Sequence, residues 1–110
     1  FFHPVAYFRF VEQMQKLGAL VPVVPGIMPF HNFARIAQFA ARDGIDIPRW
    51  VALKMEGFMD DAASIRAFGI EVVARLCERL AAGGAPGIHF YTLNQSALAL
   101  EICRRLARPV

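Results

Sequence analysis

Hydrophobic residues recur at helical spacing over most of the chain. An apolar side chain at every third or fourth position predicts a first helix from Pro4 to Leu17. The same periodicity predicts a long amphipathic helix from Ala62 to about Ala82, capped at its start by Asp60 or Asp61. Three shorter helices are predicted over 33–42, 47–55 and 97–107.

Two short apolar runs interrupt this helical pattern. Leu20–Val24 is rich in valine, and Gly87–Leu93 follows a glycine-rich turn. Runs without polar alternation are typical of buried parallel strands, although Pro22 removes one hydrogen-bond donor from the first run. Each run precedes a helix, so the sequence predicts βα units of the α/β class. Because two strands cannot form a self-sufficient parallel sheet, we expect the chain to be the C-terminal part of a larger α/β barrel.

Composition narrows the classes of protein that fit this pattern. The chain has 110 residues, enough for one domain or part of one, and 56% of them are hydrophobic. Only 19% are charged, which excludes an intrinsically disordered chain. The net charge is +3, and no basic cluster is interleaved with aromatic residues, so we expect no nucleic-acid partner.

The longest stretch without charged side chains is not expected to cross a membrane. Residues 81–100 contain no Asp, Glu, Lys or Arg, but GGAPG at 83–87 and TLNQS at 92–96 break them into three pieces. At the start of the chain, Pro4 and Arg9 interrupt the apolar residues, and no signal peptide is recognisable. We therefore expect a cytoplasmic protein without a membrane partner.

Cysteine and histidine spacing favours structural roles. Cys77 and Cys103 do not form a CxxC motif, and we expect both to be reduced, buried thiols rather than nucleophiles. His3, His31 and His89 lack the spacing of metal ligands, so no metal site is predicted.

Several segments together resemble the C-terminal region of the methylenetetrahydrofolate reductase family. They are FFHPVAYFRF at the start, VPVVPGIMPFHNF at 21–33, IPRW at 47–50 and DDAASIRAFGIEVVARLCERLAAGGAPGIHFYTLNQS at 60–96. The resemblance covers essentially all 110 residues in order, and PGIHFYTLN is its most specific part. It implies a (β/α)8 TIM barrel, of which residues 1–110 are the C-terminal fragment, from the end of strand six to the final helix. The site segments would then be the loops after strands six, seven and eight, around His3, 28–33 and 91–96.

The resemblance also implies an activity. In this family NADH or NADPH reduces FAD, and 5,10-methylenetetrahydrofolate is then reduced to 5-methyltetrahydrofolate. The family's proton-donating glutamate lies near its N-terminus and matches no residue here, so no catalytic residue is assigned to this chain. The expected partners are the folate substrate, the remainder of the barrel and further copies in a homo-oligomer. The alternatives are an inactive barrel fragment and a small folate- or nucleotide-binding module without redox chemistry.

Phe39 and Arg35 are the first two candidate substrate-binding residues. Phe39 lies off the apolar stripe of its predicted helix, and Arg35 shares that face because it precedes Phe39 by four residues. Periodicity alone favours packing of Phe39 against a neighbouring helix, whereas the resemblance implies stacking on the p-aminobenzoyl ring of folate. Arg35 replaces a glutamine that contacts folate in some members, and its charge suits the glutamyl tail.

Gln95 and Tyr91 are the other two candidates. Gln95 stands where some relatives carry a substrate-contacting arginine; alternatively, it only occupies the first turn of the last helix. Tyr91 comes at the carboxyl end of a predicted strand, where polar side chains are more often functional than structural. Alternatively, its ring packs and its hydroxyl bonds to the backbone.

Overall fold

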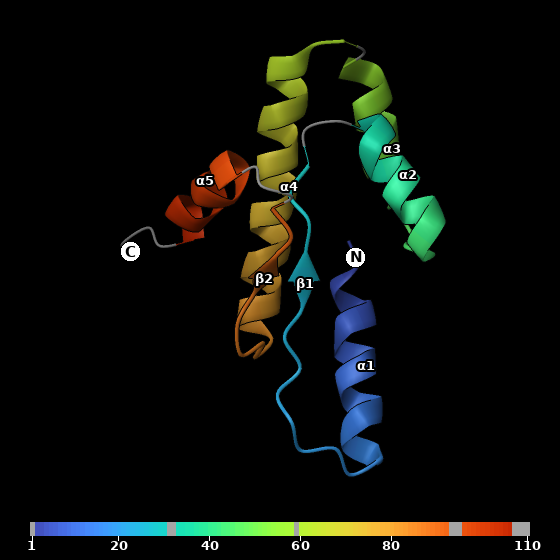
Figure 1. The fold of residues 1–110 in the computed structure, drawn as a ribbon, viewed down its shortest axis with the longest axis vertical. Helices are drawn as coiled ribbons and strands as arrows, with labels where there is room; N and C mark the ends of the chain where they lie inside the picture. Colours follow the sequence, from blue (N-terminus) through green and yellow to red (C-terminus); the bar gives the residue numbers. More distant parts are fainter. Residues whose placement is uncertain (1, 31–32, 59, 93–95, 107–110) are drawn as a thin grey trace.

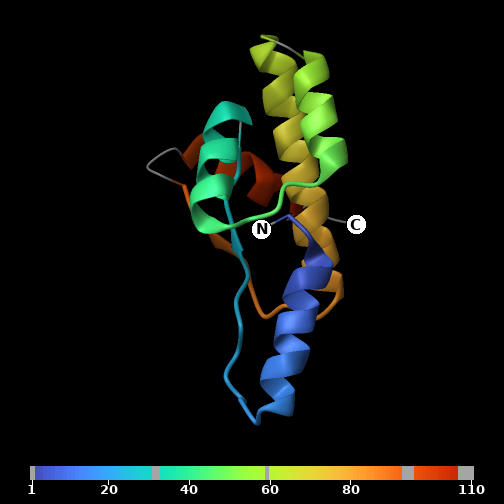
Figure 2. The ribbon, with the colours of Figure 1, turned by 90° about the vertical axis from the view of Figure 1, so that its right-hand side faces the viewer.

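Helices dominate the computed structural model, which describes residues 2–30, 33–58, 60–92 and 96–106. Within these ranges, two short strands each lead into a helix, which confirms the α/β class. The long helix α4 is central, and α1, α3 and α5 pack against it (Figures 1 and 2). In chain order the elements are α1 (Pro4–Lys16), β1 (Gly26–Ile27), α2 (Phe33–Asp43), α3 (Arg49–Phe58), α4 (Ala62–Ala82), β2 (His89–Phe90) and α5 (Ser96–Leu106).

The two strands pair in parallel, as predicted for βα units. Gly26 is in register with His89, and Ile27 with Phe90. On the two sides of this ladder, the His89 amide donates to the Pro25 carbonyl, and the amide of residue 91 donates to the Ile27 carbonyl, both at 2.9 Å. Within the described ranges only these two strands form, so the closed barrel stays a prediction.

The predicted position of the first strand is wrong. Leu20–Val24 is not a strand, and pairing begins two residues later, at Gly26. Pro22 and Pro25 cannot donate to a ladder, and the partner strand aligns with Gly26 and Ile27 instead. The second strand, His89–Phe90, lies inside the predicted run but is shorter.

The ends of α4 agree with the sequence prediction, whereas those of α3 do not. α4 begins and ends where the periodicity predicts, and Asp61 is the cap: its Oδ1 accepts from the Ser64 amide at 3.2 Å, and its Oδ2 accepts from the Ser64 hydroxyl at 2.7 Å. These hydrogen bonds from Ser64 lower the pKa of the Asp61 carboxyl. α3 departs from the prediction because it starts at Arg49 and continues through Gly57 to Phe58.

The core lies along one face of α4. Its largest fully buried side chains are Ile27, Val51, Val73, Cys77, Leu80 and Ile102. Gly69 also belongs to this face, and a Cβ atom there would overlap the carbonyl oxygen of Phe30, so the glycine lets the chain after β1 cross the helix closely. Opposite the core, the Glu71 carboxylate accepts from Arg75 Nε at 2.7 Å and from Arg105, which joins α4 to α5.

The two cysteines differ in their surroundings. Cys77 is buried and Cys103 is exposed, so the expectation of two buried thiols is wrong for Cys103. Burial raises the pKa of the Cys77 thiol to about 11, with smaller contributions from nearby Cys103 and Glu78. Ile102, next to the exposed Cys103, is fully buried in the core.

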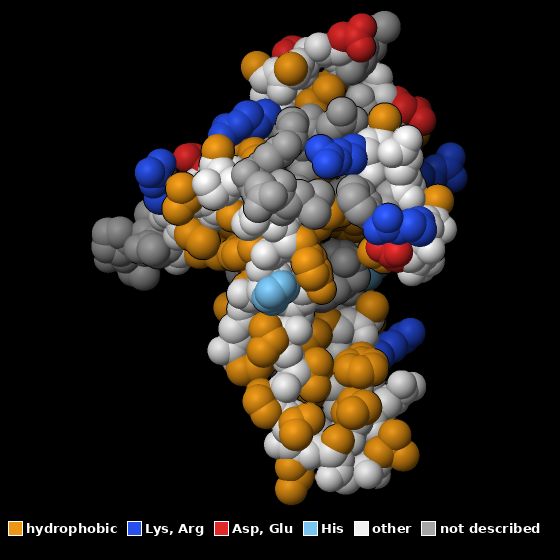
Figure 3. All heavy atoms as spheres, viewed as in Figure 1, with side chains coloured by type: hydrophobic (Ala, Val, Ile, Leu, Met, Phe, Trp, Pro, Cys, Tyr) orange, Lys and Arg blue, Asp and Glu red, His pale blue; other side chains and the backbone are white. Residues whose placement is uncertain are grey.

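Much of the segment between α1 and β1 exposes apolar side chains. It runs back alongside α1, held by a hydrogen bond of 2.7 Å from the Tyr7 hydroxyl to the Val23 carbonyl (Figure 2). Leu17, Leu20 and Val21 are 83%, 95% and 68% exposed, and hydrophobic side chains cover much of the lower half of the face in Figure 3. None of the helices in the described part of the chain is long and apolar enough to cross a membrane.

Candidate functional site

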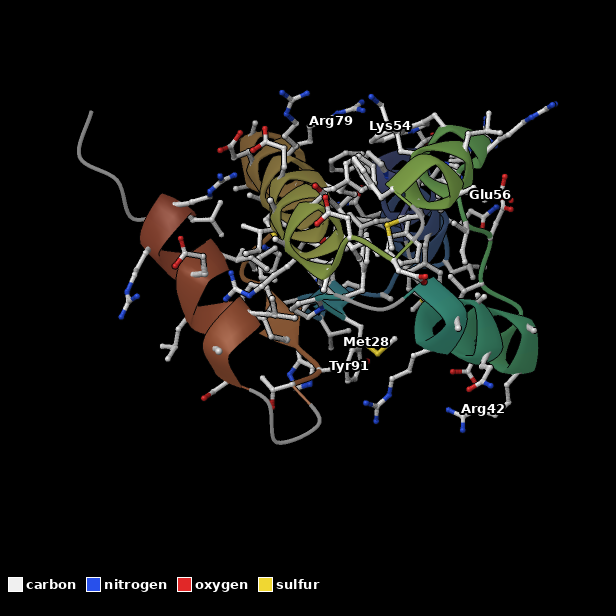
Figure 4. The ribbon with its side chains drawn as sticks, turned by 90° about the horizontal axis from the view of Figure 1, so that it is seen from above. Met28, Arg42, Lys54, Glu56, Arg79 and Tyr91 are labelled. Carbon is white, nitrogen blue, oxygen red and sulfur yellow. The ribbon has the colours of Figure 1, made fainter. Side chains whose placement is uncertain are left out.

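Met28 and Tyr91 lie at the same edge of the sheet. Each directly follows its strand, and parallel pairing brings the two carboxyl ends together. Figure 4 shows both side chains in the space between α2 and α5, the helices that follow the two strands. The segment before α1 reaches this region too, since the rings of Phe2 and Phe30 meet edge to face with centroids 5.8 Å apart.

Tyr91 presents an accessible aromatic ring at this edge. Its side chain is 52% exposed and meets His89 edge to face, with ring centroids 4.9 Å apart. The ring lies over Gly26: a Cβ atom at residue 26 would lie 2.6 Å from the Tyr91 hydroxyl oxygen and 2.7 Å from Cε2. Sequence reasoning missed Gly26, although its place between Pro25 and the buried Ile27 marks close backbone contact.

Helix α2 borders the same space (Figure 4). Arg35 is exposed, while Ala40 is buried and Ala37 is half-buried, as the predicted core stripe requires. The backbone of Phe39 is one helical turn beyond Arg35, but its side chain lies outside what the structure describes, and so does all of Gln95. The structure places Tyr91 at the strand ends and Arg35 on an exposed face of α2, and the substrate-binding roles of Arg35, Tyr91, Phe39 and Gln95 stay predictions.

The charges around this edge suit binding more than proton transfer. Residues 13–42 and 79–100 contain no Asp or Glu, whereas α2 carries Arg35 and Arg42. Arg42 Nε donates to Asp43 Oδ1 at 3.2 Å at the far end of α2. Between the strand ends and residues 42 and 100, the chain thus offers aromatic, amide and cationic groups but no carboxylic acid. No group of three or more metal-binding side chains is found among the residues that the structure describes.

Fold and site together define a class of protein. Parallel strands that lead into helices, with accessible aromatic and polar groups where the strands end, are the pattern of α/β proteins that bind ligands at that edge.

Comparison with known proteins identifies the family within this class. The methylenetetrahydrofolate reductase family profile matches residues 1–107. The chain is 33% identical over 106 residues to the 5,10-methylenetetrahydrofolate reductases of Salmonella typhimurium and Escherichia coli, covering 96% of this chain and 36% of each relative. A probable methylenetetrahydrofolate reductase (NADH) of Oryza sativa is 29% identical over 106 residues, which are 96% of this chain and 18% of that protein. The chain belongs to the methylenetetrahydrofolate reductase family, and it spans about a third of the length of its bacterial relatives.

Proposed function

We propose that this chain is part of a flavin-dependent oxidoreductase that reduces 5,10-methylenetetrahydrofolate to 5-methyltetrahydrofolate with NADH or NADPH. The observation that carries the proposal is the family match over residues 1–107, in which the paired strand ends bring Met28 and Tyr91 beside α2. The chain supplies part of the pocket for folate and nicotinamide. The remaining contacts, including the acid, come from a longer protein that is cytoplasmic and forms homo-oligomers.

The proposed architecture is a (β/α)8 barrel. In it, residues 1–110 run from the end of strand six to the last helix, with β1 in strand seven and β2 in strand eight. The short parallel pair and the helix after each strand support this assignment. The exposed apolar segment between α1 and β1 supports it as well, because neighbouring strands would cover those side chains.

The described residues fit one side of a flavin and folate pocket. The accessible ring of Tyr91 and the thioether of Met28 are suited to contact with a flat heterocycle, and Arg35 is suited to a carboxylate. In such an enzyme, bound FAD supplies the two-electron chemistry between the nicotinamide and the folate. The residues of this chain orient the substrate, with Phe39 stacking on its aminobenzoyl ring and Gln95 hydrogen-bonding to it.

The experiment is a pair of half-reactions on the full-length protein. Flavin reduction by NAD(P)H and its reoxidation by methylenetetrahydrofolate are followed separately by flavin absorbance. Phe39→Ala is expected to slow reoxidation at low folate concentration about tenfold, since one stacking contact contributes roughly 1–3 kcal/mol. Gln38→Ala, at an exposed neighbouring position of α2, is the matched control and should change neither half-reaction.

Folate tail length tests Arg35 in the same assay. Arg35→Gln should weaken binding of polyglutamyl folate more than monoglutamyl folate, because the charge acts on the tail. If Arg35→Gln changes the affinity for both folates equally, or changes neither, Arg35 does not bind the glutamyl tail.

The same measurements distinguish the alternative functions. A full-length protein that binds folate but no flavin would favour the small binding module, and one that binds neither would favour the inactive barrel fragment.

A further inference from the structure

A groove with basic and aromatic walls lies away from the strand ends. It has a volume of about 580 Å³ and runs between α3 and α4, bordered by residues 2–4 at the start of α1. Figure 4 shows Lys54 of α3 and Arg79 of α4 on one side of the molecule, with Met28 and Tyr91 on the other. Met28 and Tyr91 do not line the groove, so it differs from the strand-end site, although Phe2 reaches both. Its volume is in the range of small-molecule sites.

One wall of the groove carries an accessible indole. Trp50 is 56% exposed and meets Phe68 edge to face, with centroids 5.9 Å apart and an interplanar angle of 88°. Phe68 is held in turn by Phe58, at a centroid distance of 5.5 Å. The indole is thus fixed by its neighbours while much of its surface stays open, which suits stacking of a flat ring.

Three cations face this aromatic wall. Lys54 follows Trp50 by one turn of α3, and Arg75 and Arg79 are one turn apart on α4, so each pair shares a helix face. Within the described residues, Lys54 and Arg79 form no ion pair, and Arg75 is held through its Nε by Glu71. Glu71 is the one carboxylate among the described lining residues, and Arg105 also neutralises it.

The spacing of the groups indicates the size of the ligand. Arg75 follows Phe68 by seven residues on α4, which is about 10 Å along a helix that rises roughly 1.5 Å per residue. A ring stacked near Phe68 and Trp50 would therefore need an anionic group about that far away, or slightly nearer because the arginine side chains are long. A purine nucleoside diphosphate has these proportions, whereas a bare phosphate leaves the aromatic wall empty.

We propose that this groove binds a small organic anion in which a flat ring is joined to phosphate groups, a purine nucleotide being the simplest example. The ring stacks on Trp50, and the phosphates are bound by Arg75 and Arg79. This proposal does not depend on the reductase activity proposed above.

Calorimetric titration with ADP tests the site on the full-length, flavin-loaded protein, without folate or NAD(P)H. We expect saturable binding that weakens at least tenfold in Arg75→Met/Arg79→Met and in Trp50→Ala. Trp50→Phe should retain most of the affinity because it keeps a ring. Arg104→Met, an exposed cation on α5, is the matched control and should bind as the parent does.

Three further measurements separate the alternatives. Adenosine and inorganic pyrophosphate should each bind at least tenfold more weakly than ADP. Adenosine can contact only the aromatic wall, and pyrophosphate can contact only the cations. ADP affinity that is unchanged in the groove variants would assign the binding to a nicotinamide or flavin site and overturn the proposal. A polyglutamate peptide that binds through the groove while ADP does not would make it a peptide surface and overturn it as well. Equal thermal unfolding of parent and variants shows that each loss is local.

Discussion

Among the glycines that the structure describes, Gly69 is the one at which an added Cβ atom would overlap backbone. It lies where α4 passes the carbonyl of Phe30, the residue that leads from β1 toward α2. Gly69→Ala should lower the free energy of unfolding by about 1–3 kcal/mol, because backbone rather than a flexible side chain blocks the new methyl group. Gly57→Ala on α3 is the control: a Cβ atom there meets nothing within 4 Å, and alanine should stabilise the helix by about 0.5–1 kcal/mol. Urea unfolding measures both, and a stabilised Gly69→Ala variant would contradict the close crossing.

The thiols of Cys77 and Cys103 should differ in reactivity. Cys77 is buried with its pKa raised to about 11, so at pH 8 it is almost entirely a protonated thiol, whereas Cys103 is exposed. Titration with Ellman's reagent should show one fast thiol from this chain and a second after unfolding. Cys103→Ser should remove the fast phase; a fast phase that survives would mean that Cys77 is accessible.

Single residues of the site show where sequence reasoning succeeded and where it stopped. A polar aromatic at a strand end is recognisable locally, and Tyr91 does follow β2 and is exposed, while its role in binding stays a prediction. The contact of its ring with Gly26 could not be predicted, because those residues are 65 positions apart and meet only through strand pairing. The roles of Phe39 and Gln95 stay predictions.

At the scale of elements, Glu71 joins α4 to α5. Hydrogen bonds from Arg105 and then Arg75 lower its pKa, so the ionised form is favoured in the folded protein. This contribution to stability is therefore present above the carboxyl's unfolded pKa and is lost as the pH falls through the lower folded pKa. Because the side chain is 43% exposed, we expect Glu71→Gln to cost only about 0.5–1 kcal/mol at pH 7.

The pH dependence of Glu71→Gln provides the check. The difference in unfolding free energy between parent and variant should shrink toward zero in acid and also at high salt. Glu78→Gln, an exposed acid on the same helix, is the control and should show little difference at any pH. A Glu71→Gln effect that persists unchanged in acid would mean that shape, not charge, joins the two helices.

Helices and strands differed in how well they could be predicted. The bounds of α4 follow from its own periodicity and its Asp61 cap, both of which are local. The position of β1 depends on where β2 pairs, which is decided by residues more than 60 positions away, and apolar content alone placed it too early. Cys103 was misjudged for a related reason, since which side of α5 is covered depends on how that helix packs on α4.

In the molecule as a whole, the exposed apolar side chains of the segment between α1 and β1 are expected to be covered by another part of the protein. Soluble monomers rarely expose contiguous apolar patches, and parallel sheets are normally covered on both faces. In the isolated chain, Leu20→Lys/Val21→Lys should reduce self-association and binding of a hydrophobic dye. In the longer protein proposed above, the same pair should lower the free energy of unfolding by more than about 3 kcal/mol, because each buried Leu or Val contributes about 1.5–3 kcal/mol.

A charge-matched variant controls for solubility. Ala81→Lys/Ala82→Lys adds the same charge at exposed positions of α4 and should be neutral in the longer protein. The decisive result is that Leu20→Lys/Val21→Lys improves the behaviour of the isolated chain by reducing its self-association, but destabilises the longer protein. If they are harmless in both, the segment is not covered by a barrel.

Periodicity, caps and motifs such as PGIHFYTLN are properties of neighbouring residues, so the α/β class, the bounds of α4 and the family can be read along the chain. The folded chain was needed to show which residues pair as strands, that Tyr91 covers Gly26, which cysteine is exposed, and that Trp50, Lys54 and Arg79 border one groove. The reason is physical: these features depend on contacts between segments distant in sequence, and the free energy of such contacts is set by packing and pairing rather than by local conformational preference.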